Sequence, residues 1–248
     1  MAVIFLDLYG VLADSRKMES LYNERMAAIL HRRHGGSLET WRRLQDESYV
    51  WYQAEGRKLD ERPGEDREGD AWVSAVQRLN AGQVLWIFER AGLPEPEDAL
   101  GYSEALEAET VREIDALYPD ARPALHALVT QGHRLLLSTN ANRANAESAL
   151  IGGGVRDLFD GLAMLETARA KKDRPYYWRR AFALAGTRPD EAVVVDDVVR
   201  FLSPAAELGA RCIQLLRPGL RHRVIRADDP PTAFPVIPDL TALTDLVR

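Results

Sequence analysis

The sequence predicts an α/β fold in which a Rossmann-like parallel sheet carries helices on both faces and receives an inserted α-helical cap domain. Four short, apolar runs predict the strands, and they lie at residues 3–6, 134–138, 192–195 and 211–215. Segments with helical spacing precede the second and third runs. Such alternation is typical of right-handed βαβ units, which form a parallel sheet covered on both faces.

The first run, Val3–Leu6, is short, contains β-branched and aromatic residues, and stops at Asp7, so it reads as a fully buried strand. Between residues 12 and 111 no clear strand-like run occurs. Aromatic and aliphatic side chains recur there at helical spacing, among them Trp41, Leu44, Trp72 and Leu79. We therefore predict a helical cap domain at residues 14–111 and a core domain at residues 1–13 and 112–248.

Two polar segments read as exposed connections. Residues 55–69 are rich in charge and contain Pro63 and Gly64, which indicates a connection inside the helical domain. Residues 217–233 contain three prolines and a glycine, which indicates a surface loop. After this loop, residues 235–237 predict a last strand and residues 240–247 a last helix.

The composition limits the classes of partner and compartment. The chain of 248 residues has a formal net charge of -6 and a pI near 5.5, which gives no electrostatic reason to expect nucleic acid or an anionic membrane as a partner. Its first apolar run is too short for a signal peptide or a membrane span, so we expect a cytoplasmic protein. We expect a small-molecule substrate and a monomer or homodimer. The single cysteine, Cys212, reads as a small buried hydrophobe on a strand.

Polar side chains of matched chemistry follow the predicted strands. In open parallel sheets, substrates bind outside the carboxyl ends of the strands. The residues at these ends are Asp7 after the first run, Thr139 and Asn140 after the second, and Asp196 and Asp197 after the third. Lys172 lies between the second and third runs. A carboxylate nucleophile, a hydroxyl and an amide for an oxyanion, a lysine and an acidic pair for a divalent metal are a coherent set for phosphoryl transfer.

In their order and spacing, these motifs resemble the haloacid dehalogenase superfamily of hydrolases over nearly the whole chain. The segment at residues 5–12 resembles the first motif, in which Asp7 is the nucleophile and forms a covalent ester. Leu137-Ser138-Thr139-Asn140 is similar to the second motif. Lys172-Asp173-Arg174-Pro175 resembles the third, although the proline usually next to the lysine is absent, and Lys171 is the weaker candidate. Val195-Asp196-Asp197 resembles the fourth.

The first motif departs from the phosphatases of this superfamily at Tyr9. Most of these phosphatases carry there a second aspartate, which protonates the leaving group and then activates water. A phenol with a pKa near 10 is a poor general base at neutral pH. The Asp-x-Tyr-Gly pattern instead resembles the 2-haloacid dehalogenases, whose cap arginine holds the substrate carboxylate. By that resemblance Arg42 is the candidate substrate-binding residue, with Arg43 next.

The fourth motif favours the phosphatases, because dehalogenases generally have neutral residues in place of its acidic pair. Three converging carboxylates without a cation would repel one another. The resemblance implies a Mg²⁺ ion held by Asp7, the main-chain carbonyl of Tyr9 and Asp197, with Asp196 acting through water. Our first hypothesis is a Mg²⁺-dependent phosphohydrolase of a small phosphorylated metabolite, in which Thr139 and Lys172 hold the charge of the phosphate.

Three alternatives remain open from the sequence. The first is a carbon-halogen hydrolase, in which Asp7 attacks carbon. The second is phosphonate-type chemistry with a cap lysine, for which Lys17 and Lys58 are available. The third is a binding protein that has kept the fold and lost turnover.

Overall fold

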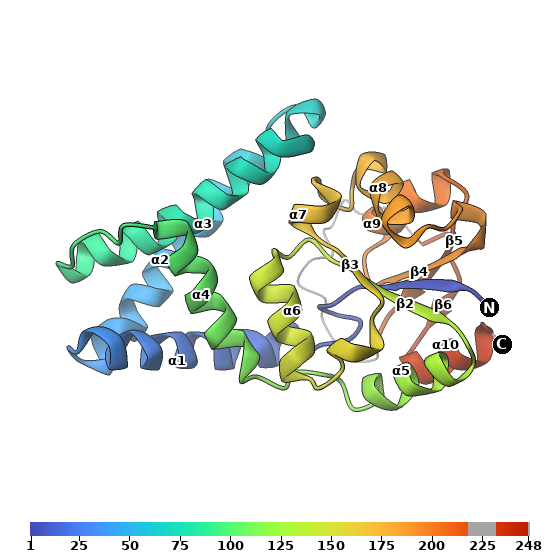
Figure 1. Cartoon of the computed structure of the whole chain (residues 1–248), viewed down its shortest axis with the longest axis horizontal. Helices are drawn as coiled ribbons and strands as arrows, with labels where there is room; N and C mark the ends of the chain where they lie inside the picture. The colour runs from blue at the N-terminus through green and yellow to red at the C-terminus, as the bar shows by residue number, and fades with distance from the viewer. Residues whose placement is uncertain (218–231, 248) are drawn as a thin grey trace.

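The computed structural model describes residues 1–217 and 232–247, which form a parallel six-stranded sheet, surrounding helices and a helical insert (Figure 1). The strand order is β3-β2-β1-β4-β5-β6. The strands are β1 (Val3–Leu6), β2 (Arg134–Ser138), β3 (Gly161–Ala163), β4 (Ala192–Asp196), β5 (Arg211–Leu215) and β6 (Val236–Ile237). The predicted α/β class is confirmed. The short strand β3 had not been predicted.

Two helical layers cover the sheet, because successive strand side chains point to opposite faces. On one face, Ile4 and Leu6 pack in a core with α5 (Ala121–Thr130), α6 (Arg143–Gly152) and α10 (Leu240–Leu246). On the other face, Val3 and Phe5 pack with α7 (Leu165–Ala168), α8 (Pro175–Ala185) and α9 (Val199–Glu207). Short 3-10 turns complete this part of the chain at η2 (Arg156–Leu158) and η3 (Pro189–Glu191).

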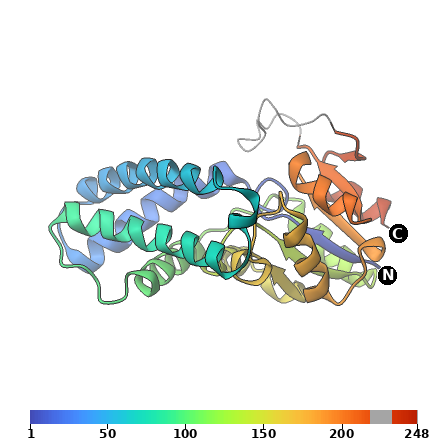
Figure 2. The same cartoon turned by 90° about the horizontal axis from the view of Figure 1, so that it is seen from above.

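Four long helices follow β1 and form the helical insert, which we define as residues 15–112. They are α1 (Ser15–His34), α2 (Leu38–Asp60), α3 (Gly69–Ala91) and α4 (Ala99–Arg112), with a 3-10 turn η1 (Gly64–Arg67) between α2 and α3. The insert has an apolar cluster of its own, which includes Trp41, Leu44 and Phe88. Figures 1 and 2 show the insert beside the sheet, at the end opposite the two chain termini.

The predicted connections agree only partly with the structure. The polar stretch from residue 55 begins inside α2, which continues to Asp60 because Glu, Arg and Lys are good helix formers. The predicted last strand and helix are present as β6 and α10. Most of the loop predicted at residues 217–233 lies outside the described residues.

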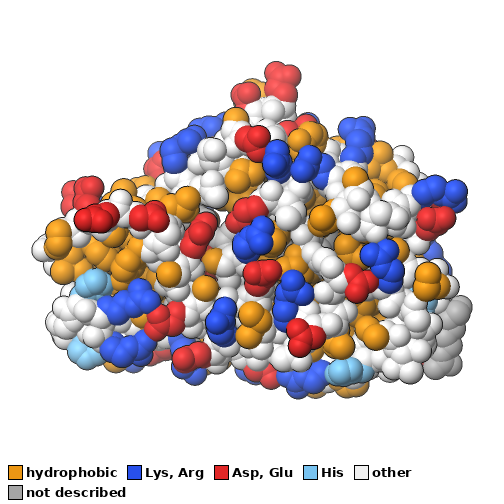
Figure 3. Space-filling view, in the orientation of Figure 1, with side chains coloured by type: hydrophobic (Ala, Val, Ile, Leu, Met, Phe, Trp, Pro, Cys, Tyr) orange, Lys and Arg blue, Asp and Glu red, His pale blue; other side chains and the backbone are white. Residues whose placement is uncertain are grey.

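Charged side chains of both signs are mixed on the surface. On the face shown in Figure 3, basic and acidic side chains alternate over the insert and the core. Among the described residues, no helix combines the length and apolarity that crossing a membrane requires. Cys212 is buried on β5, as predicted, and its thiol is free.

Candidate active site

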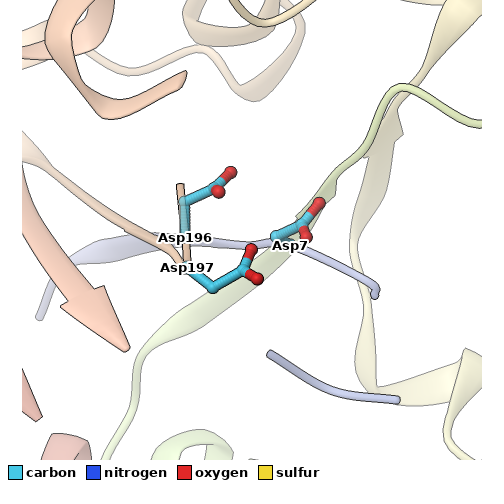
Figure 4. Close-up of side chains that lie close together, drawn as sticks. All are labelled: Asp7, Asp196 and Asp197. Carbon is cyan, nitrogen blue, oxygen red and sulfur yellow. The ribbon is translucent and has the colours of Figure 1, made fainter. Parts of the chain in front are cut away.

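Three carboxylates gather at the carboxyl ends of two neighbouring strands. Strands β1 and β4 pair in parallel with Leu6 opposite Val195, so the next residues, Asp7 and Asp196, lie side by side. Asp197 follows directly. Carboxylate oxygens of these three residues lie within 4.8 Å of one another (Figure 4). All three side chains are buried. The pairing of β1 with β4 therefore brings this part of the predicted site together.

Lys172 joins the carboxylates from the loop between α7 and α8. Only 1% of its surface is exposed. Its Nζ donates to Asp7 Oδ1, to Asp196 Oδ2 at 2.6 Å and to the main-chain oxygen of Ser138 at 3.3 Å. The structure therefore places Lys172, rather than Lys171, at the acidic cluster. We call Asp7, Lys172, Asp196 and Asp197 the acidic site.

Hydrogen bonds from outside the acidic site fix the backbone of Lys172. Its main-chain N–H donates to Asn140 Oδ1 at 2.9 Å. Its main-chain oxygen accepts from Trp178 Nε1 at 2.9 Å, and Trp178 is fully buried on α8. These two contacts orient the loop that delivers the ammonium group.

The same loop is tied to the helical insert. Lys171 forms an ion pair with Asp60 at the end of α2. Arg174 Nε lies 3.0 Å from Glu68 Oε1, and the main-chain N–H of Gly69 donates to Arg169 at 2.9 Å. The insert is thus anchored directly beside the site, and the position of Lys172 depends on both parts of the chain.

Burial and charge shift the pKa values of the acidic site. Burial raises the pKa of Asp7 well above its ordinary value; Lys172 opposes this shift, and the two other carboxylates add to it. Burial likewise raises the pKa of Asp196 to about 6, although Lys172 opposes it. Burial alone would lower the pKa of Lys172, but Asp196 and Asp7 outweigh it and the pKa rises. Lys172 therefore stays charged, but its single positive charge does not balance the three carboxylates.

Gly10 makes room for Asp197. Its φ of +97° lies in the left-handed region, which favours glycine. A Cβ atom added at this position would overlap the carboxylate of Asp197. Gln214 Nε2 donates to the main-chain oxygen of Asp197 at 2.9 Å from the neighbouring strand β5. The glycine of the first motif therefore has a steric role in the site as well as a role in the turn.

The two residues after β2 take different places. Thr139 is buried, and its hydroxyl oxygen accepts from the main-chain N–H of Ala141 at 3.2 Å. Asn140 supports Lys172 through its amide oxygen, and it also lines a cavity of about 590 Å³ between the core and the insert, together with Lys171 and Arg200. Asn140 thus lines a cavity and also holds the backbone of Lys172 in place. Sequence reasoning had missed this second contact.

Tyr9 is not suited to act as a general base. Its hydroxyl donates to Asn145 Oδ1 at 2.7 Å, and Asn145 Nδ2 donates to Glu107 Oε1 at 3.0 Å. Burial and the nearby Glu107 raise the pKa of Tyr9 above its ordinary value. The phenol remains protonated at neutral pH and acts as a hydrogen-bond donor. Asn145 and Glu107 had no motif around them, and only the packing of α4 against α6 reveals their contact.

The cap arginines suggested by the resemblance, Arg42 and Arg43, lie away from the acidic site. Arg42 Nη2 lies 2.6 Å from Glu24 Oε2 on the exposed surface, and Arg43 pairs with Glu47. The reason is the helical period: Trp41 and Leu44 form the buried side of α2, which turns the two arginines to solvent. The structure does not bring Arg42 to the acidic site. Of the two cap lysines, Lys17 is exposed and Lys58 pairs with Glu55 at the surface.

Comparison with known proteins decides the family. A family model described as haloacid dehalogenase-like hydrolase matches residues 1–209. The chain belongs to this family. The chain also matches the enolase-phosphatase E1 of Frankia alni, with 36% identity over 112 residues, which are 44% of this chain and 47% of the relative. Protein CbbY of Cereibacter sphaeroides is 30% identical over 109 residues, 41% of this chain and 46% of the relative. The chain thus aligns with about half the length of these curated relatives.

Solved structures share the fold of this chain over its whole length. The L-2-haloacid dehalogenase of Xanthobacter autotrophicus with chloropropionic acid covalently bound superposes with a TM-score of 0.62 at 18% identity, over 100% of this chain and 98% of that chain. A HAD phosphatase from Thermococcus onnurineus has a TM-score of 0.59, also at 18% identity, with the same coverage. At these identities the likeness establishes the fold alone.

Proposed function

We propose that this hydrolase is a Mg²⁺-dependent phosphohydrolase of a small phosphorylated metabolite, with Asp7 as the nucleophile. The observation that carries the proposal is the convergence of three buried carboxylates, two of which share a single lysine. Such a cluster retains a net negative charge, which would repel an anionic substrate. A divalent cation removes this obstacle, and oxygen ligands are those that Mg²⁺ prefers.

The donor set fits such an ion. Asp7, Asp197 and the main-chain oxygen of Tyr9 are the groups that would hold it. Both carboxylate oxygens of Asp196 already accept hydrogen bonds, from Lys172 and from the main-chain N–H of Val198 at 2.9 Å. This favours an indirect role for Asp196, through water. When bound, Mg²⁺ would neutralise charge on the carboxylates and on the phosphate.

The side chains of the site have defined parts in the proposed reaction. A carboxylate oxygen of Asp7 forms a bond to phosphorus, and the bond from phosphorus to the leaving oxygen breaks. Lys172 and Thr139 stabilise the charge on the remaining phosphoryl oxygens. Water then attacks phosphorus in the aspartyl phosphate, which releases phosphate and restores Asp7. Tyr9 supplies neither acid nor base, so the favoured substrates have a leaving oxygen that needs little protonation.

One residue supports a carbon-halogen hydrolase as the second candidate. Tyr9 completes the Asp-x-Tyr-Gly pattern, and in that reaction Asp7 would displace halide from carbon without a leaving-group acid. The acidic pair speaks against it, because an anionic haloacid would meet Asp196 and Asp197 with only Lys172 to compensate.

The test is a panel of phosphorylated metabolites assayed for phosphate release with Mg²⁺ and with EDTA, beside halide release from chloropropionate. We expect phosphate release that requires Mg²⁺ and disappears in Asp7→Asn. Halide release without metal would overturn the proposal in favour of the second candidate. Silence on both panels, at confirmed Mg²⁺ binding, would favour a binding protein.

A further inference from the structure

A second cavity lies inside the helical insert. Its volume is about 200 Å³, and its walls come from α1, α2, α3 and α4, with α6 of the core and its N-cap closing one side. The polar side chains that matter here are Tyr22, Gln45, Tyr49, Tyr52, Glu107 and Asn145. This volume is below the roughly 300–1,000 Å³ usual for drug-sized ligands, so the cavity would hold a short group and not a nucleotide.

Glu107 contributes a carboxyl group to the wall of the cavity. Asn142 Nδ2 donates to one of its carboxylate oxygens at 2.7 Å, and Asn145 Nδ2 donates to the other at 3.0 Å. Each oxygen retains room for another donor. Among the described residues, no side-chain nitrogen of Lys, Arg or His lies within 4.0 Å of a Glu107 carboxylate oxygen, so none forms an ion pair with it. A carboxylate that is enclosed by protein and lacks a cation favours a cationic guest.

Gln45 is an independent sign that something binds there. Its side chain lines the same cavity and is 0% exposed. Neither its Nε2 nor its Oε1 has a hydrogen-bond partner. Buried amides normally have partners, so this side chain offers one acceptor and two donors to an occupant. An occupant with both N–H donors and an oxygen acceptor would satisfy Gln45 and Glu107 together.

Aromatic rings complete the chemistry of the cavity. Tyr22, Tyr49 and Tyr52 contribute to its walls, and the face of a tyrosine ring attracts cations. Tyr52 itself donates to Asn80 Oδ1 at 3.0 Å and also borders the larger cavity between insert and core. We propose that this cavity binds the protonated amino group of a short amino alcohol, which is the leaving group of the phosphoester substrate.

Hydrogen bonds connect the wall of the cavity to Tyr9, which lies in the turn after Asp7. Its hydroxyl donates to Asn145, which in turn donates to Glu107, and Tyr9 lies two residues after Asp7. The assignment as a leaving-group site rests on the proposed function, whereas the binding of an amine does not. The two inferences also agree chemically. A positive charge on the leaving group lowers the pKa of its hydroxyl, so less help from an acid is needed where Tyr9 replaces the usual aspartate.

Calorimetry with phosphate-free ligands tests the binding site independently of hydrolysis. The probes are ethanolamine, aminopropanol and aminobutanol, each compared with the diol and with the hydroxy acid of the same chain length. We expect at least one amino alcohol to bind about tenfold more tightly than its diol, since a charge-assisted hydrogen bond contributes that much or more. The hydroxy acids should bind most weakly. Equal binding of amine and diol, or no binding of any amine at millimolar concentration, would overturn the proposal.

Two variants locate the effect. Glu107→Gln should lose about tenfold in affinity for the amine and little for the diol. Glu104→Gln is the matched control: it removes the same charge from the same helix, but Glu104 does not line the cavity. An equal loss in both variants would mean a diffuse electrostatic effect and contradict the site. Gln45→Leu should weaken amine and diol together and retain the preference between them.

Hydrolysis assays separate this inference from the proposed function. If the amino alcohols bind and no phosphate ester on the panel is cleaved, the binding site stands and the phosphatase proposal fails. If the amino alcohols bind and only other phosphate esters are cleaved, the phosphatase proposal stands and the assignment as a leaving-group site fails. If other phosphate esters are cleaved with Mg²⁺ and no amine binds, the phosphatase proposal stands and this inference fails.

Discussion

Replacing Lys172 by methionine tests how the acidic site is held together. Methionine retains an apolar side chain of similar length and removes the charge. The ammonium group donates to Asp7, to Asp196 and to the main-chain oxygen of Ser138, at a position that is 1% exposed. Removing one partner from a buried ion pair costs about 3–5 kcal/mol, because the other charge is left buried and uncompensated. We expect Lys172→Met to lose this amount of unfolding free energy in EDTA.

The assay is urea denaturation in EDTA and in saturating Mg²⁺. A cation that binds only the folded protein adds stability, and the variant has one positive charge fewer at the site, so Mg²⁺ should stabilise Lys172→Met more than the wild type. Lys171→Met is the matched control, since that lysine pairs with Asp60 in a partly exposed position and should cost about 0–1 kcal/mol. Wild-type stability of Lys172→Met in EDTA would refute the electrostatic account of the site.

The remaining predictions concern the first motif and the cavity in the insert. Gly10→Ala should destabilise the protein by about 1–3 kcal/mol in urea and weaken Mg²⁺ binding, because its Cβ would overlap Asp197 at a positive φ. The control Gly186→Ala should show only the strain, since nothing lies within 4 Å of its added Cβ. Equal Mg²⁺ affinities in both would contradict this role of Gly10. Tyr9→Asp should raise phosphate release, because it supplies the missing acid; unchanged or lower turnover with intact Mg²⁺ binding would show that the native site does not lack one. Burial raises the pKa of Glu107, so this carboxyl contributes stability at low pH that is lost as the pH rises through its raised value. Glu107→Gln does not titrate, and its stability relative to the wild type should therefore increase from about pH 4 upward, whereas parallel stability curves would contradict the shift.

The strands that carry the site were predictable because their residues are buried on both faces. Continuous apolar runs such as Ala192–Val195 are typical of central parallel strands, and the rule that strand ends carry function then led to Asp7, Asp196 and Asp197. The strand β3 has only three residues, Gly161–Ala163, and its sequence has no apolar run long enough to distinguish it from a turn.

The contacts between distant segments were not predictable from local patterns. Arg42 was suggested by resemblance, but the period of α2 places it on the solvent side of Trp41. Glu107 and Asn145 are 38 residues apart and meet only because α4 packs against α6. Sequence periodicity gives the buried side of a helix and does not say which other helix covers it.

The central claim is that Asp7 becomes phosphorylated during turnover. It is tested most directly by acid-quenching the working enzyme with Mg²⁺ and a substrate, reducing it with borohydride and sequencing its peptides by mass spectrometry. An acyl phosphate at Asp7 would be reduced to homoserine, and the account predicts this conversion at Asp7, dependent on substrate. Homoserine at another aspartate, or turnover with Asp7 unmodified under these conditions, would contradict the account.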